Sequence, residues 1–191
     1  MVKPHEVLKY LKGTLDYDIK YTDASDVELI GYSDSDWAGN LDDRRSTTGY
    51  AFSIGSGVVS WSRKKQPTVS LSSTEAEYKA LCAATCEVVW LRRLLQDVGE
   101  ERKEMIKCDN QSSINIAKTP IFHAMTKHVE AQFHFVREKL QSNEITLMYC
   151  NTSVNAADIF TKPLGKIKFE LFREMLGVEV NPFSIKGETW K

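Results

Sequence analysis

The feature that most constrains the fold is a long amphipathic segment over residues 73–98. The sequence Ser72-Ser73-Thr74-Glu75 at its start fits a helix-capping box, and Gly99 follows its end. Its apolar residues recur every three or four positions, as on one face of an α-helix, at Ala80, Ala84, Val88, Leu91, Leu95 and Val98. We therefore predict one long helix whose apolar stripe must be buried against a second layer of structure.

Strand signals lie on both sides of this helix. The predicted strands are residues 28–34, 50–54, 58–63, 105–109 and 144–149. The second and third are joined by a hairpin turn at Gly55-Ser56-Gly57. Further helices are predicted over residues 4–12, 110–118, 126–141, 155–161 and 166–176. Three antiparallel strands followed by alternating strands and helices indicate an α/β fold, with helices packed on a mixed sheet.

Composition excludes several other classes of protein. The 191 residues are 42% hydrophobic and 27% charged, as in a globular domain and unlike a disordered tail or a coiled-coil rod. No segment approaches the roughly 18–20 apolar residues of a membrane helix, and the N-terminus is not a signal peptide. A net charge of −1 argues against a general polyanion binder, although local basic clusters can still bind nucleic acid. The four cysteines lack metal-binding spacing and are expected to be buried free thiols in a reducing compartment.

Four acidic residues stand where predicted strands end or helices begin: Asp34, Glu77, Asp109 and Asp158. Functional sites of open sheets gather at the carboxyl ends of strands. Glu77 precedes Ala80 and Ala84 by three and seven residues, so it faces the sheet on the buried stripe. A carboxylate there is costly unless it is paired or holds a metal ion.

Each acidic residue also has a structural interpretation. Glu77 is near a helix N-terminus, where negative charge is favourable, and Asp109 can serve as an N-cap. Asp34 can be a turn residue, with Asp36 taking its place in another strand register, and Asp158 can lie on a helix surface. Taken together, several carboxylates converging at strand ends cannot all remain ionised without cations, which favours a metal site.

Six motifs then resemble, in order, the ribonuclease H domain of copia-type retrotransposon Pol polyproteins. They are GYSDSDWAGN, DDRRSTTGYAF, WSRKKQPTVSLSSTEAEYKAL, CDNQSS, FHAMTKHVE and AADIFTKPL. The opening LKYLKGTLDY resembles the connection from that family's reverse transcriptase. The resemblance implies three parts: residues 1–25 as the end of that connection, 26–164 as the ribonuclease H domain, and 165–191 as a C-terminal helix and tail. The first helix is expected to be severed from an upstream polymerase.

The resemblance implies a five-stranded ribonuclease H fold and cleavage of the RNA strand of an RNA–DNA hybrid during reverse transcription. It implies that Asp34, Glu77, Asp109 and Asp158 are catalytic and hold two Mg²⁺ ions, for which Mn²⁺ can substitute. The loop at residues 150–157 lacks the histidine that many cellular relatives carry, and Asn155 is a candidate to position the site instead.

Substrate contacts follow from the same resemblance. Asn40 matches a residue that lines the RNA strand. Ser73, Thr74 and Gln111 match residues at the minor groove of the hybrid, where 2′-hydroxyl groups are displayed. For Ser73 and Thr74 the alternative is helix capping. Arg44-Arg45 and Arg63-Lys64-Lys65 are candidates to hold phosphates or are solvated without a role. Trp37 and Trp61 are expected in the core.

The implied partners are an RNA–DNA hybrid and the upstream reverse transcriptase domain of the same polyprotein, with no membrane. The implied location is intracellular, in a cytoplasmic virus-like particle. Two rival hypotheses remain: a domesticated or inactive copy that only binds nucleic acid, and an integrase-like nuclease acting on DNA. Glu77 on the first long helix favours ribonuclease H over the integrase-like group.

Overall fold

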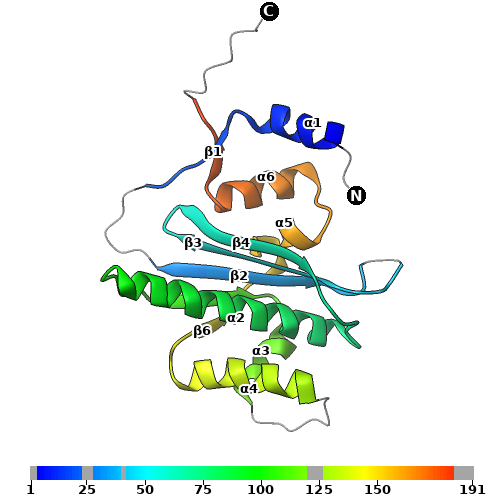
Figure 1. The fold of residues 1–191 in the computed structure, drawn as a ribbon, viewed down its shortest axis with the longest axis vertical. Helices are drawn as coiled ribbons and strands as arrows, with labels where there is room; N and C mark the ends of the chain where they lie inside the picture. The colour runs from blue at the N-terminus through cyan, green and yellow to red at the C-terminus, as the bar shows by residue number, and fades with distance from the viewer. Residues whose placement is uncertain (1–3, 23–27, 40–41, 120–126, 183–191) are drawn as a thin grey trace, which may run out of the picture.

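The computed structural model describes residues 4–22, 28–39, 42–119 and 127–182, of which 127–129 are described by their backbone only (Figure 1). Its strands are β1 (Tyr17–Ile19), β2 (Leu29–Asp36), β3 (Thr47–Ile54), β4 (Gly57–Lys65), β5 (Glu104–Cys108), β6 (Thr146–Tyr149) and β7 (Val178–Val180). Its α-helices are α1 (Pro4–Thr14), α2 (Ser73–Asp97), α3 (Gln111–Lys118), α4 (Lys127–Gln141), α5 (Asp158–Thr161) and α6 (Lys166–Met175), with a 3₁₀ turn η1 at Thr152–Val154.

The main sheet has five strands in the order β4-β3-β2-β5-β6. β3 runs antiparallel to β2 and β4, whereas β5 runs parallel to β2 and β6 parallel to β5. This confirms the predicted α/β fold with a mixed sheet. Because β2 and β5 are adjacent and parallel, their carboxyl ends meet at one edge of the sheet.

Helix α2 covers one face of the sheet, with α3 and α4 beyond it, while α5 and α6 lie on the opposite face (Figure 1). The core on the α2 side joins helix residues such as Leu81 and Val88 to Phe52 of β3 and Ile106 of β5. The predicted apolar stripe is buried along most of α2. It ends before Val98, which is the C-cap of α2 and is 69% exposed.

The opposite face depends on a glycine in β3. Gly49 pairs with Asp34 across the sheet, and α5 lies directly over it. A Cβ at this position would lie 2.7 Å from Cγ2 of Thr161 and 3.0 Å from Cβ of Phe160. Only the absence of a side chain therefore lets α5 approach the end of β2 this closely.

A second, two-stranded sheet joins distant parts of the chain. β1 pairs antiparallel with β7, so that Tyr17 lies opposite Val180. The sequence did not predict β7, since three residues carry too little alternation to signal a strand. Helix α1 forms as predicted but buries none of its residues.

Two smaller expectations were wrong. Trp37 and Trp61 are both 55% exposed and do not belong to the core. The indole of Trp37 instead donates a hydrogen bond to the carbonyl of Ser70 at 3.2 Å. Cys86 is exposed, whereas the other three cysteines are buried as expected and all four are free. Among the described residues, no helix is long and apolar enough to span a membrane.

Candidate active site

The four predicted carboxylates converge at the sheet edge where β2 and β5 end. Asp34 lies near the end of β2, Glu77 in the first turns of α2, Asp109 directly after β5, and Asp158 at the start of α5. Oxygens of Asp34, Asp109 and Asp158 lie within 4.8 Å of one another. The same spacing holds for ligand atoms of Glu77, Asp109 and Cys108, so Asp109 is shared by two sets.

Burial sets the electrostatics of this cluster. Asp34 and Asp158 are fully buried, and Glu77 is 7% exposed. Burial, reinforced by the negative charges of Asp34 and Asp109, raises the pKa of Glu77 to about 9. Burial also raises the pKa of Asp34, against the opposing effects of Thr161 and Lys162. Such shifts are typical of carboxylates that share one site with too little positive charge.

One oxygen of this cluster is unsatisfied. The buried Oε2 atom of Glu77 has no hydrogen-bond partner. A buried, partnerless carboxylate oxygen is costly, and a cation is the partner that removes this cost. Asp and Glu oxygens are also the ligands that Mg²⁺, Mn²⁺ and Ca²⁺ prefer. The residues of the site therefore fit a hard divalent cation.

Two lysines lie inside the cluster, and the sequence analysis did not identify them. Nζ of Lys162 lies 2.9 Å from Asp34 Oδ1 and 2.8 Å from Asp158 Oδ1. Nζ of Lys168, from α6, lies 2.7 Å from Asp158 Oδ2. Although burial opposes it, the contacts with Asp158 and Asp34 raise the pKa of Lys162. Lys162 is the C-cap of α5 and follows Asp158 by four residues, a spacing that was a signal available in the sequence.

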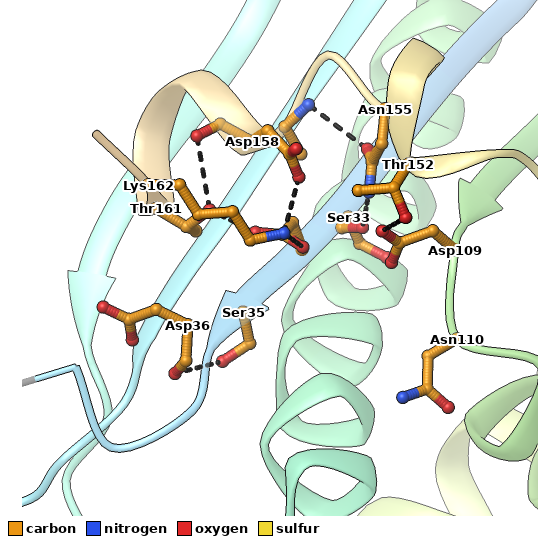
Figure 2. A network of polar contacts seen from close by, with 12 residues as sticks. Ser33, Ser35, Asp36, Asp109, Asn110, Thr152, Asn155, Asp158, Thr161 and Lys162 are labelled. Carbon is orange, nitrogen blue, oxygen red and sulfur yellow. Dashed lines mark hydrogen bonds and ion pairs between the residues drawn. The ribbon is translucent and has the colours of Figure 1, made fainter. Parts of the chain in front are cut away.

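Short polar side chains fix the surrounding loops (Figure 2). The Thr161 hydroxyl donates to Asp34 Oδ2, and the Thr152 hydroxyl donates to Asp109 Oδ2 at 2.7 Å. Asn155 is fully buried, and its amide donates to the carbonyl of Ser33 at 3.1 Å. This bond ties the loop before α5 to the strand that carries Asp34.

The structure also tests the alternative interpretations. Ser72 is the N-cap of α2, because its hydroxyl accepts from the N–H of Glu75, so capping does not explain Ser73 and Thr74. The N-cap of α3 is Asn110 rather than Asp109. Asp36 accepts from the N–H of Thr47 and holds the end of the β2–β3 pair.

The predicted substrate residues occupy adjacent helix starts. Ser73 is exposed and Thr74 half-buried at the start of α2, and Gln111 is exposed at the start of α3. The two helix starts are joined because the hydroxyl of Ser113 donates to the carbonyl of Thr74 at 3.1 Å. Asn40 lies outside the described residues.

The basic run Arg63-Lys64-Lys65 is exposed at the end of β4, as are Arg44 and Arg45 in the loop before β3. Asp43 bridges the two clusters, with its Oδ2 atom 2.7 Å from Lys65 Nζ and 3.6 Å from Arg45 Nε. Exposed lysine and arginine side chains are the groups that bind phosphates electrostatically.

Solved structures share this architecture. The N-terminal RNase H domain of Rv2228c from Mycobacterium tuberculosis superposes with a TM-score of 0.52 at 15% identity, covering 78% of this chain and 97% of that one. LC11-RNase H1, solved in complex with an RNA/DNA hybrid, gives a TM-score of 0.52 at 14% identity, covering 70% of this chain and 94% of its own. The chain therefore has a ribonuclease H-like fold.

Sequence comparison then identifies the relatives. A retrovirus-related Pol polyprotein from transposon TNT 1-94 of Nicotiana tabacum is 41% identical over 176 residues, which is 92% of this chain and 13% of that protein. The chain is thus homologous to one segment of retrovirus-related Pol polyproteins of plant transposons, and it spans only about an eighth of their length. No family model matches the sequence.

Proposed function

We propose that this chain is a metal-dependent endoribonuclease that hydrolyses the RNA strand of RNA–DNA hybrids during retrotransposon reverse transcription. The observation that carries the proposal is the convergence of Asp34, Glu77, Asp109 and Asp158 at the strand ends of a ribonuclease H-like sheet, with one carboxylate oxygen of Glu77 buried and unpartnered. Homology to Pol polyproteins and the hybrid bound by LC11-RNase H1 support the substrate.

In this proposal the four carboxylates hold two divalent cations, Mg²⁺ with Mn²⁺ as a substitute. When bound, such ions polarise the scissile phosphate and lower the pKa of the attacking water. Asp109 belongs to both ligand sets and so joins the two halves of the site. Thr152 and Asn155 keep the carboxylates in place through their hydrogen bonds to Asp109 and Ser33.

The substrate would lie across the adjacent starts of α2 and α3. There, Ser73, Thr74 and Gln111 are placed to contact 2′-hydroxyl groups, and Asn40 is assigned to the same strand by resemblance. Contacts to the 2′-hydroxyl distinguish RNA from DNA with little reading of base sequence. The exposed run at 63–65 would hold phosphates on the hybrid.

The homology also suggests how the chain is divided, which protein it acts with and where it acts. We assign residues 1–25 to the end of the reverse transcriptase connection, 26–164 to the ribonuclease H domain and 165–191 to a C-terminal helix and tail. The upstream polymerase of the same polyprotein would then be the main protein partner, and the enzyme would act inside the cell in a virus-like particle.

Cleavage of a labelled RNA–DNA hybrid tests this function. We expect cutting of the RNA strand alone in Mg²⁺, none in EDTA, and a loss of at least about 100-fold in Asp109→Asn. Asp97→Asn, at the exposed far end of α2, is the matched control and is expected to cut normally. RNA–RNA and DNA–DNA duplexes should remain intact.

The same assay separates the rivals. Hybrid binding without cleavage by the folded protein, in both Mg²⁺ and Mn²⁺, would replace the nuclease with a binding module of the same fold. Cleavage of duplex DNA would support the integrase-like alternative.

A further inference from the structure

The carboxylate cluster has two halves, Asp34 with Asp158 and Glu77 with Asp109. They differ in how their negative charge is balanced. Both oxygens of Asp158 face an ammonium group: Oδ1 lies 2.8 Å from Lys162 and Oδ2 lies 2.7 Å from Lys168. Asp34 is also fully engaged, by Lys162 at Oδ1 and by the Thr161 hydroxyl at Oδ2. In Figure 2, Lys162 and Asp158 lie together on one side of the site and Asp109 with Thr152 on the other.

The other half has no such pairing among the described residues. Glu77 keeps an unpartnered oxygen, and Asp109 accepts from the neutral hydroxyl of Thr152. Neither residue forms an ion pair with a lysine or arginine of the described chain. A divalent cation can therefore reach Glu77 and Asp109 without displacing a lysine ammonium group.

At Asp34 and Asp158 the situation is reversed. An ammonium group and a divalent cation on the same carboxylate oxygens repel each other. The lysines are able to leave, because their side chains are 34% and 35% exposed while the carboxylates are fully buried. A lysine ammonium on a flexible four-carbon stem moves to water at low cost.

Lys168 also belongs to a different part of the chain from the rest of the cluster. It lies on α6, and its Nζ atom is 5.0 Å from the ring centroid of Phe172, which is fully buried one turn further along. The strand that follows α6 is β7, which pairs with β1. The contact between Lys168 and Asp158 therefore connects the carboxylate cluster to the C-terminal helix.

We propose that Lys162 and Lys168 are internal counter-ions of Asp34 and Asp158, which divalent cations displace when they load that half of the site. The proposal rests on the metal site of the proposed function. Two classes of cation affinity follow: a tighter one at Glu77 and Asp109, and a weaker one that competes with the lysines. Lys168 lowers the cation affinity of the weaker class. Because Lys168 lies on α6, this affinity depends on the position of that helix.

Lys168→Gln tests this without any substrate. Mn²⁺ binding is measured by isothermal titration calorimetry on the full chain, and thermal unfolding is measured in EDTA. Because the variant removes the repulsion between the ammonium group and the cation, we expect the weaker class to bind about 10-fold more tightly, with the tighter class unchanged. In EDTA the variant should melt at a lower temperature, because Asp158 loses a partner while it stays buried.

The control is Lys166→Gln, on the same helix. Its side chain is 85% exposed and its contact with Glu170 is 3.9 Å long, so both measurements should match the wild type. Lys168→Arg keeps the positive charge, so its weaker class should bind Mn²⁺ with the affinity of the wild type. Far-UV circular dichroism establishes that each variant is folded.

Unchanged Mn²⁺ affinity in folded Lys168→Gln, or weaker binding, would overturn the counter-ion role and leave the proposed function standing. Absence of Mn²⁺ binding by the wild type would instead remove the metal site itself, and with it both proposals. Tighter binding in the variant together with a hybrid that is never cut would uphold the counter-ion role and contradict only the nuclease activity.

Discussion

Replacing Glu77 with glutamine is expected to make the cation-free protein progressively more stable, relative to the wild type, as the pH rises. The folded-state pKa of Glu77 is about 9, against an ordinary value of 4.5, chiefly because the carboxyl is buried and faces Asp34 and Asp109. Lys162 opposes these effects only in part. Between these two pKa values the native protein binds a proton that the unfolded chain has released.

The direction of the pH dependence follows from this difference. The contribution of Glu77 is fully present below pH 4.5 and is lost as the pH rises toward the folded-state value of about 9. One extra bound proton changes the free energy of unfolding by about 1.4 kcal/mol per pH unit. From pH 5 to pH 8, the wild type should therefore lose about 4 kcal/mol relative to Glu77→Gln.

Urea unfolding in EDTA at several pH values measures this difference. The slope with pH is the informative quantity, since the glutamine amide keeps the shape of the side chain but adds a pH-independent cost for its own buried N–H groups. Glu101→Gln, which removes an exposed carboxylate outside the cluster, is the control substitution. A difference between Glu77→Gln and the wild type that does not change with pH would show that Glu77 is ionised in the folded protein, and would refute the electrostatic account of the cluster.

Two further substitutions test how the scaffold holds the site. Gly49→Ala should push α5 away from β2, lowering both Mn²⁺ affinity and hybrid cleavage at least about 10-fold, whereas Gly165→Ala, where a Cβ meets nothing within 4 Å, should change neither. Asn155→Ala should lower the free energy of unfolding by about 1–3 kcal/mol in urea titrations, because the carbonyl of Ser33 loses its buried partner. Unchanged stability in Asn155→Ala would mean that this bond does not hold the loop.

The predictions that the structure confirms were based on local sequence patterns. The spacing of Glu77 from Ala80 and Ala84 placed its carboxylate toward the sheet, and it is indeed buried there. The ends of β2 and β5 were each marked by an aspartate, and adjacent parallel strands bring such ends together whatever the intervening sequence. Both inferences depend on local pattern plus a general rule of sheet geometry.

Contacts between distant or irregular segments could not be predicted from local sequence patterns. The bond from Asn155 to Ser33 joins residues 122 apart in the chain, and Lys168 reaches Asp158 only because of how α6 turns back after α5. The pairing of β1 with β7 involves two three-residue strands from opposite ends of the chain. None of these has a repeating pattern, because each is specified by tertiary packing rather than by the period of a helix or strand.

Two features of the site, its lysines and the raised pKa of Glu77, solve one physical problem by different means. Four carboxylates at a buried edge repel one another, and the fold limits that repulsion with ammonium groups at Asp34 and Asp158 and with a retained proton at Glu77. Both devices are reversible, since a lysine can move to solvent and a proton can dissociate. A hydrophobic replacement would stabilise the fold without cations but could not bind them. The arrangement is therefore suited to a protein that must fold before its cations arrive and release its own positive charges when they do.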